Sequence, residues 1–254
     1  MKKIEAIILD LDGTLLTDNK KISEETINFL KSISKDIRII LASARQFVTI
    51  KPYLEQLDLI NSDNYTICFN GSLVVDNLEN KFICSNIDFN IIKNIDSFIL
   101  ENNIDWTYYM YDNRYLRSNI SNIDDIINKD IYKIVGISTI ENINNIRNNL
   151  SDFIINILEI TSSELNRIEF VSKGMNKVKA IEMLLNKLNI DKSNVIAIGD
   201  GDNDIDMIKY VGYGIAMLNS PDKVKSSAKI ITKYTNNEDG VYKVIKDILE
   251  GIYE

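Results

Sequence analysis

The sequence predicts an α/β fold with a doubly wound, mainly parallel sheet and an inserted α+β domain. In both terminal parts of the chain, short apolar runs of strand length alternate with amphipathic stretches at helical spacing. This alternation predicts right-handed crossovers and a parallel sheet with helices on both faces. The middle of the chain instead mixes alternating segments with Asn-rich helical pieces. That change of pattern predicts a separate, inserted unit.

The N-terminal part contains three apolar runs that are typical of strands buried on both faces. They lie at residues 4–9, 37–42 and 65–69. Between the first two runs, Ser23 is expected to cap a helix whose apolar side carries Leu30. Each run ends at a polar cluster, as expected where a parallel strand leaves the sheet.

The same pattern returns near the C-terminus. An amphipathic helix is expected at residues 176–188, followed by a buried strand at 195–199. Short strands at 214–217 and 229–232 precede a closing helix that begins at about residue 239. We therefore assign residues 1–79 and 173–254 to one Rossmann-like core domain and residues 80–172 to the inserted α+β domain.

The composition restricts the possible chemistry. The 254 residues include 29 Lys and Arg against 37 Asp and Glu, for a net charge of −8, which argues against a nucleic-acid or anionic-membrane partner. The absence of His excludes Ser-His-Asp hydrolysis and His-ligated zinc, and two Cys cannot form a zinc site alone. Catalysis must use carboxylates, hydroxyls, Lys, Arg or a hard metal ion bound through oxygen.

No export signal or membrane span is expected. The apolar stretch after Met1 is broken by Glu5 and ends at Asp10, whereas a signal peptide needs about 7–15 apolar residues. No run approaches the roughly 20 apolar residues of a spanning helix. We therefore expect a cytoplasmic protein.

Acidic residues follow two of the predicted strands. Asp10 and Asp12 end the first run, and Asp200 and Asp204 follow the strand at 195–199. Ligand sites in open α/β sheets lie beyond the carboxyl ends of the strands, so these groups are expected to converge. Two such charges 4 Å apart repel by about 4 kcal/mol at an effective dielectric of 20. A divalent cation would remove that cost, and oxygen ligands favour Mg²⁺. Either cluster alone could equally well cap the following helix; both together favour the cation site.

Several motifs resemble those of the haloacid dehalogenase (HAD) superfamily of phosphohydrolases, and within it the Cof-type group. Residues 10–16, DLDGTLL, resemble the first motif, and residues 199–207, GDGDNDIDM, resemble the fourth. Residues 42–45, ASAR, and 173–177, KGMNK, are similar to the second and third motifs. Ala44 stands where the family usually has Gly, which would cause strain only at positive φ. The resemblance implies a HAD core, with residues 80–172 as a cap of the C2B type (class IIB).

The resemblance also implies roles for the acidic residues. Asp10 would be the nucleophile that forms an aspartyl-phosphate, and Asp12 would be the general acid and base. Mg²⁺ would be held by Asp10, Asp12 (through its main-chain carbonyl) and Asp200. Because the chain has no His, the acid and base group is expected to be a carboxylate of raised pKa.

Further residues are implied to bind the phosphate group or to support the site. The phosphate oxygens would be held by Ser43, the Ala44 amide, Lys177 and Asn203. The supporting set is Thr14, Arg45, Asn70, Gly71 and Asp204. Arg45 could contact substrate or pair with a carboxylate, and Asp204 could hold a metal-bound water or orient Lys177. In the inserted domain, Arg114 and Arg117 could reach substrate, but a solvated edge is the favoured expectation for both.

The favoured expectation is a Mg²⁺-dependent phosphatase of small phosphorylated metabolites. The resemblance points to sugar phosphates, pyridoxal phosphate or FMN as the substrate range. A phosphomutase on the same scaffold, or a non-catalytic sensor that binds Mg²⁺ and a phosphorylated metabolite, are the alternatives. We expect a monomer or homodimer without nucleic-acid or membrane partners.

Overall fold

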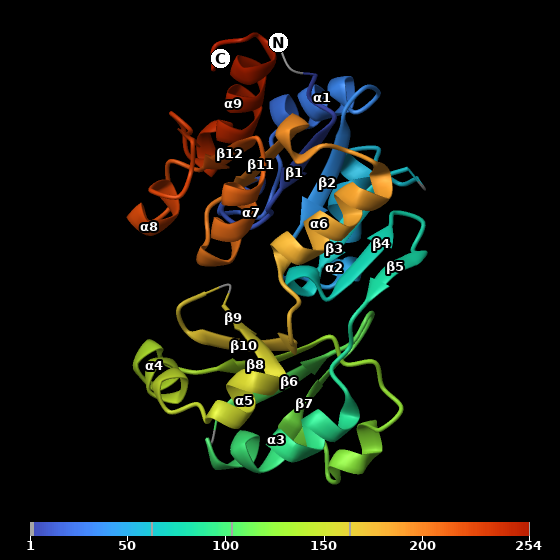
Figure 1. Cartoon of the computed structure of the whole chain (residues 1–254), viewed down its shortest axis with the longest axis vertical. Coiled ribbons are helices and arrows are strands. Elements are labelled where there is room, and N and C mark those ends of the chain that lie inside the picture. Colours follow the sequence, from blue (N-terminus) through green and yellow to red (C-terminus); the bar gives the residue numbers. More distant parts are fainter. Residues whose placement is uncertain (1–2, 62, 103, 163, 254) are drawn as a thin grey trace.

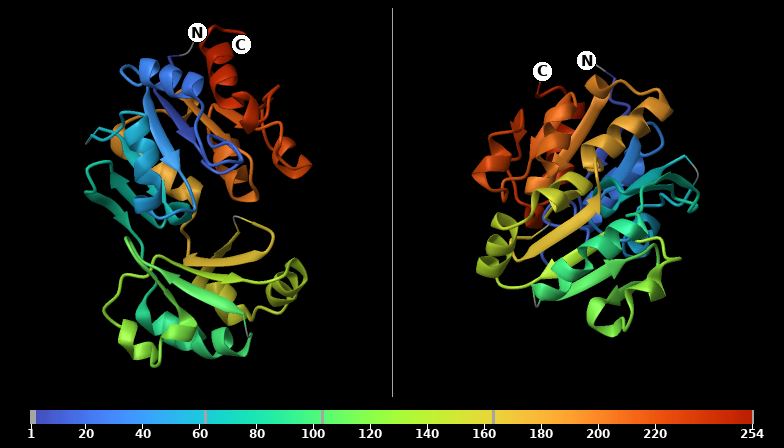
Figure 2. Two further views of the ribbon diagram at one scale, coloured as in Figure 1. Left: turned by 180° about the vertical axis from the view of Figure 1, so that it is seen from behind. Right: turned by 60° about the horizontal axis from the view of Figure 1, so that its bottom comes forward.

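The chain folds into two lobes, each built on its own sheet (Figure 1). The computed structural model describes residues 3–61, 63–102, 104–162 and 164–253. Both termini lie at the end of the first lobe that is remote from the second lobe, and Figure 2 shows the same arrangement from two further directions. No helix in these described ranges has the length and apolar character needed to cross a bilayer.

The first lobe contains an eight-stranded sheet in the order β13-β12-β11-β1-β2-β3-β4-β5 among the described residues. Its parallel strands are β1 (Ala6–Leu9), β2 (Arg38–Ala42), β3 (Tyr65–Cys68), β11 (Val195–Gly199), β12 (Tyr213–Ala216) and β13 (Ile230–Ile231). The strand order reverses at β1, which lies between β2 and β11. The α/β fold class with a mainly parallel sheet is therefore confirmed.

An antiparallel hairpin extends this sheet at one edge. It consists of β4 (Leu73–Asp76) and β5 (Lys81–Cys84), and β4 pairs with β3. These strands were not predicted, because each has only four residues and they follow β3 without an intervening α-helix. The pairing places β5 in the first sheet, although the proposed division at residues 79 and 80 assigned it to the inserted domain. The domain division itself stays a prediction.

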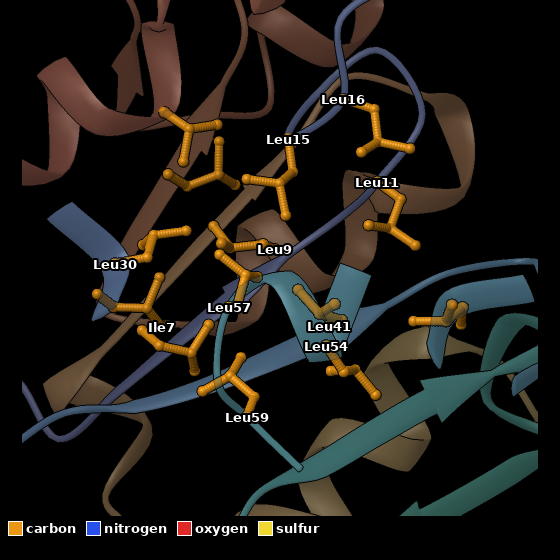
Figure 3. Close-up of a cluster of buried hydrophobic side chains, with 14 of the residues drawn as sticks. Ile7, Leu9, Leu11, Leu15, Leu16, Leu30, Leu41, Leu54, Leu57 and Leu59 are labelled. Atoms are coloured by element: carbon orange, nitrogen blue, oxygen red, sulfur yellow. The ribbon is translucent and has the colours of Figure 1, made fainter. Parts of the chain in front are cut away.

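Helices cover both faces of the first sheet because its strands are apolar on both sides. In β1, Ile7 and Leu9 pack toward one face and Ala6 and Ile8 toward the other. The first face is covered by α1 (Glu24–Ile33), α2 (Phe47–Gln56) and α9 (Gly240–Leu249), and the second by α6 (Lys177–Leu188) and α7 (Ile205–Tyr210). Figure 3 shows the first of these clusters, including Ile7, Leu9 and Leu30.

Side chains cap the first turns of α1 and α6, and the second of these caps fixes a residue of the site. The Ser23 hydroxyl accepts a hydrogen bond from Thr26 N at 3.1 Å, so the expected cap is confirmed. Asn176 Oδ1 accepts a hydrogen bond from Lys179 N at 2.8 Å and caps α6. Lys177 is therefore the first residue of a capped helix, and its backbone is fixed where the chain returns to the first lobe.

The second lobe contains an antiparallel sheet of five strands in the order β7-β6-β8-β10-β9 among the described residues. They are β6 (Asp105–Tyr109), β7 (Arg114–Leu116), β8 (Lys133–Ile137), β9 (Leu158–Thr161) and β10 (Arg167–Ser172). One face, with Trp106, Ile134 and Phe170, is buried in the core of this lobe. The helices packed with that core are α3 (Phe89–Glu101), α4 (Ile140–Asn148) and α5 (Asp152–Ile157). The mixed α+β character expected for the insertion is confirmed.

The remaining elements are short. They are α8 (Asp222–Lys225) and the 3-10 helices η1 (Phe69–Gly71), η2 (Arg117–Asn119), η3 (Ile123–Ile126), η4 (Lys192–Asn194), η5 (Asp202–Asp204) and η6 (Asn236–Glu238).

The two lobes touch through specific contacts. The ring of Phe69, just after β3, stacks on Tyr132 of the second lobe with centroids 5.4 Å apart. Gln46 Nε2 donates hydrogen bonds to the carbonyl oxygens of Met110 and Asn113, both at 2.9 Å. The structure therefore holds the second lobe closed over the carboxyl ends of the parallel strands.

Candidate active site

The polar clusters of four parallel strands meet at one edge of the first sheet. Asp10 follows β1, Ser43 follows β2, Asn70 lies just beyond β3, and Asp200 follows β11. These strands are neighbours in the order β11-β1-β2-β3, so their carboxyl ends lie side by side. The site is thus at the point where the strand order reverses, where open α/β sheets bind ligands.

A buried ammonium group joins the first and fourth motifs. Lys177 Nζ lies 2.5 Å from Asp10 Oδ1 and 2.7 Å from Asp204 Oδ1. All three residues are buried, with Lys177 only 1% exposed. The two carboxylates raise the pKa of Lys177 against the opposing effect of burial, so the amine is charged. Of the two expected roles of Asp204, orientation of Lys177 is the one that this contact fits.

Three carboxylates form a compact group around this ammonium. Oxygens of Asp10, Asp200 and Asp204 all lie within 4.8 Å of one another. When all three carboxyl groups are ionised, they and Lys177 carry a formal charge of −2, which one divalent cation would neutralise. Since the donors are all oxygens, the group fits a hard cation such as Mg²⁺. The expected ligand set contained Asp12 rather than Asp204, whereas the side-chain cluster contains Asp204.

The pKa values of Asp10 and Asp200 are raised within this cluster. Burial and repulsion by Asp204 raise the pKa of Asp10 well above its usual value, although Lys177 opposes the shift. Burial and the Asp204 charge likewise raise the pKa of Asp200 to about 6. Without a cation, these carboxyl groups therefore hold protons at a pH where exposed aspartates are ionised.

Hydrogen bonds of ordinary length hold the residues of the fourth motif in place. Asp204 Oδ2 accepts hydrogen bonds from the N–H groups of Asp200 at 3.1 Å and Gly201 at 3.0 Å. Thr14 Oγ1 donates to Asp200 Oδ1 at 2.9 Å and so orients the Asp200 carboxylate. At Gly13, φ is 80° and a Cβ would lie 2.3 Å from Asp200 Oδ2. Only glycine fits there, because a side chain would displace the Asp200 carboxylate.

Asp12 lies in a different environment from Asp10. Its carboxylate accepts two hydrogen bonds from Arg45 and one from Lys20, each at 2.6 Å. Burial raises the pKa of Asp12, but these two cations outweigh that effect and hold the pKa below its usual value. The expectation of a raised pKa at the acid and base group is therefore wrong for Asp12 in this structure. Of the two roles left open for Arg45, the ion pair is the one that is seen.

The second-motif loop has an unstrained backbone. Ser43 is buried, and its hydroxyl accepts a hydrogen bond from Arg45 N at 3.2 Å. Among the described residues, the non-glycine positions with positive φ do not include Ala44, so Ala in place of Gly causes no strain. The Ala44 carbonyl accepts a hydrogen bond from Lys133 Nζ of the second lobe at 2.8 Å.

Asn70 connects three parts of the molecule. Its Oδ1 accepts a hydrogen bond from Asn203 Nδ2 at 3.0 Å, and its Nδ2 donates to Glu169 Oε2 at 3.0 Å. Asn70 is 1% exposed and has a left-handed backbone, with φ 55°. At Gly71, a Cβ would lie 2.2 Å from the carbonyl oxygen of Asn176, so the loop can approach the start of α6 only with glycine there.

Three charged residues near the site were not predicted from the sequence: Lys133, Glu169 and Lys20. Lys133 and Glu169 are buried, and their charged groups lie 3.5 Å apart. Each is a charged residue next to apolar residues of its strand, which is the one sequence signal that could have marked them as candidates. Arg114 lines a pocket between the lobes. Arg117 does not line that pocket and instead pairs with Asp96 at 2.7 Å.

Two pockets adjoin the carboxylate cluster. The larger one has a volume of about 640 Å³, and we call it the acid-side pocket because Asp12 lines it together with Ala44, Arg45, Arg114, Lys133, Arg167 and others. The smaller one, of about 370 Å³, is the lysine-side pocket, lined by Lys177, Asn70, Asn203, Thr161, Arg147 and others. Both are formed by residues of both lobes.

Comparison with known proteins gives a consistent result. The model of the haloacid dehalogenase-like hydrolase family matches residues 7–245. The chain is 31% identical to the 5-amino-6-(5-phospho-D-ribitylamino)uracil phosphatase YcsE of Bacillus subtilis, over 96% of this chain and 95% of that one.

Solved structures of two such proteins have the same fold as this chain. A haloacid dehalogenase-like hydrolase of Bacteroides thetaiotaomicron is 26% identical, with a TM-score of 0.87 over 97% of this chain and 100% of the other. The HAD subclass IIB sugar phosphatase BT4131, at 22% identity, shares the fold with a TM-score of 0.80 over 96% and 98% of the two chains.

The pKa shifts predict how the site responds to Mg²⁺. In the metal-free protein, the raised pKa values of Asp10 and Asp200 mean that folding favours their protonated forms. Their contribution to stability is therefore lost as pH rises through these raised values, which for Asp200 is about 6. A divalent cation such as Mg²⁺ would bind the ionised forms of these carboxyl groups. We expect Mg²⁺ to raise the melting temperature at pH 8 and this increment to fade below about pH 6.

The measurement is thermal unfolding in EDTA and in Mg²⁺ at several pH values. Asp200→Asn should abolish the Mg²⁺ increment, and Asp222→Asn, which removes an exposed aspartate of the same lobe, should retain it. An increment of equal size in Asp200→Asn would contradict the proposed ligand group.

Proposed function

The chain belongs to the haloacid dehalogenase-like hydrolases, Cof-type, and from that membership we propose that it is a Mg²⁺-dependent phosphatase acting through an aspartyl-phosphate on Asp10. The observation that carries the proposal is the group of buried Asp10 and Asp204 and half-buried Asp200 beside the Lys177 ammonium. A nucleophilic carboxylate and a phosphate dianion can approach only where positive charge offsets both. Lys177 supplies one such charge next to the nucleophile.

Mg²⁺ would be held by Asp10 and Asp200, with the main-chain carbonyl of Asp12. When bound, it would neutralise charge on the phosphoryl oxygens and on the carboxylates. The support for this assignment is the all-oxygen, doubly negative cluster described above.

The first chemical step belongs to Asp10 and Asp12. Lys177 orients the Asp10 carboxylate, one oxygen of which attacks phosphorus while the bond from phosphorus to the leaving oxygen breaks. Asp12 gives its proton to that leaving oxygen. Ser43, the Ala44 amide, Lys177 and Asn203 are proposed to hold the phosphoryl oxygens. The products of this step are the free alcohol and the phosphorylated Asp10.

The second step releases phosphate. The Asp12 carboxylate takes a proton from water as the water oxygen attacks phosphorus, and the Asp10 carboxylate leaves. Arg45 and Lys20 hold the pKa of Asp12 below its usual value, so the carboxylate is ionised and free of a proton before this step, but it is a weaker base than an unpaired aspartate. For the first step Asp12 must carry a proton, so its ion pair with Arg45 must open. We propose that the substrate phosphate competes with Asp12 for the Arg45 guanidinium and thereby frees the carboxyl for protonation.

The second lobe would act as the cap that excludes water during phosphoryl transfer. Its contacts with the core loops, at Gln46, Ala44 and Asn70, support a closed arrangement over the site. Residues 80–172 are thus proposed as a C2B-type cap, with residues 1–79 and 173–254 as the catalytic core.

The proposed substrates are small phosphorylated metabolites of the sugar phosphate, pyridoxal phosphate or FMN class. The phosphatases among the similar proteins support the broader class. A phosphomutase would release an isomerised sugar phosphate instead of free phosphate, and a sensor would bind Mg²⁺ and ligand without turnover. Cytoplasmic localisation and a monomeric or homodimeric state stay predictions from the sequence.

Removal of the nucleophile tests the chemistry. Asp10→Asn should reduce phosphate release by more than about 10³-fold, because the amide cannot form the phosphorylated intermediate. The circular dichroism spectrum should stay unchanged, which separates loss of chemistry from loss of fold. Peptide mass analysis of acid-quenched wild-type protein should locate a phosphoryl group on Asp10. Normal hydrolysis by Asp10→Asn would refute the nucleophile assignment.

A second prediction separates the roles of Asp12 and Ser43. p-Nitrophenol is a good leaving group that needs no proton, so Asp12→Ala should release one burst of it per site and then turn over slowly. On alkyl phosphates the same variant should be inactive. Ser43→Ala loses one donor to the phosphate, so its loss of about 10²-fold should be similar for both kinds of ester. Rapid-mixing kinetics measures both, and identical profiles for the two variants would contradict the roles.

A further inference from the structure

One face of the cap sheet is polar and points at the active site. The strand register pairs Tyr109 with both Arg114 and Lys133, so these three side chains lie on the same face. Two and four residues after Lys133 come Val135 and Ile137, which pair with Glu169 and Arg167. The opposite face carries the apolar core of the lobe.

Contacts to the core show where the polar face points. Lys133 reaches the Ala44 carbonyl, and Glu169 accepts a hydrogen bond from Asn70. Arg114, Lys133 and Arg167 all line the acid-side pocket. Three cationic residues from three different strands of the cap therefore surround one space next to the site.

The acid-side pocket is the one that receives the leaving group. The proton for the leaving oxygen comes from Asp12, and Asp12 lines this pocket but not the lysine-side pocket. The leaving part of the substrate must therefore place its leaving oxygen next to Asp12, and the rest of it must extend toward the cap. At about 640 Å³, the pocket has room for a small metabolite.

The charge of this pocket opposes that of the whole protein. Among the described residues its lining includes five cationic side chains and three acidic ones, in a chain of net charge −8. The cations are Lys20, Arg45, Arg114, Lys133 and Arg167, and the acids are Asp12, Asp18 and Glu164.

The cap arginines retain capacity to bind an anion. Within the described ranges, Arg114 takes part in no ion pair. Arg167 pairs with Glu164 through Nη2 at 3.1 Å, while its buried Nε–H has no hydrogen-bond partner in the structure. A buried donor without a partner is costly, and an anionic oxygen in the pocket would satisfy it.

We propose that the substrate carries a second anionic group on its leaving part, a carboxylate or a second phosphate, which Arg114 and Arg167 bind in the acid-side pocket. The inference rests on the proposed phosphatase function and narrows its substrate class. Guanidinium groups suit this task because they bind planar carboxylates and phosphates through paired hydrogen bonds.

The test compares esters that differ only in the second anion. The reference is sorbitol 6-phosphate, and the anionic partners are 6-phosphogluconate, with a carboxylate at the other end, and sorbitol 1,6-bisphosphate. We expect kcat/KM for at least one anionic ester to exceed that of the reference by about ten-fold or more. The anionic ester with the higher kcat/KM identifies the second anion as a carboxylate or a phosphate.

Three variants assign the preference to the pocket. Arg114→Gln should lower the ratio of anionic to neutral kcat/KM about ten-fold, whereas Glu164→Gln should raise it, because it frees Arg167. Lys93→Gln makes the same charge change on α3, where Lys93 pairs with Asp124 at 2.9 Å outside both pockets, and should leave the ratio unchanged.

Two results would overturn the inference while leaving the phosphatase proposal intact: equal or better hydrolysis of the neutral ester, or an anionic preference that Arg114→Gln and Glu164→Gln both leave unchanged. If no ester, including p-nitrophenyl phosphate, releases phosphate in Mg²⁺, the proposed function itself fails, and the inference fails with it.

Discussion

The Lys177 ammonium between Asp10 and Asp204 is the interaction on which the site depends. Three ionised carboxylates this close together, two of them buried, would repel one another strongly without it. The backbone around it is built to bring the groups together. Asn176 caps the helix that Lys177 begins, and Gly13 allows the Asp200 carboxylate to approach the loop after β1. The ammonium leaves two negative charges uncompensated, so the same arrangement that positions a nucleophile also favours a divalent cation.

The role of Lys177 was implied only by the resemblance of residues 173–177 to a family motif. The convergence of Asp10 and Asp200, in contrast, could be predicted because it follows from a simple rule. Carboxyl ends of neighbouring parallel strands share one edge of a sheet, and the motifs come directly after such strands. An ion pair was one of two expected roles of Arg45, but its partner Asp12 and the second cation, Lys20, could not be predicted, because several acids lie within reach of these long side chains. For that reason the expected raised pKa was assigned to the wrong carboxylate.

The cap was harder to interpret than the core for a physical reason. A parallel strand buried on both faces is recognisable as an apolar run, whereas a cap strand carries an apolar face and a ligand-facing face in alternation. Lys133 and Glu169 lie on the second kind of face, and their pairing is set by strand register, which no short motif records. The chemistry of phosphoryl transfer is thus readable from the core motifs, while substrate choice depends on side chains that only the folded cap brings together.

The central claim is that acidic groups from the two ends of the chain bind one divalent cation beside Lys177. Crystals grown with Mn²⁺ in place of Mg²⁺ would test it most directly, because Mn²⁺ gives an anomalous scattering signal. The account predicts one strong peak in contact with carboxylate oxygens of Asp10 and Asp200, with Lys177 still bound to Asp204. A peak at another place, or these carboxylates too far apart to share one ion, would contradict it.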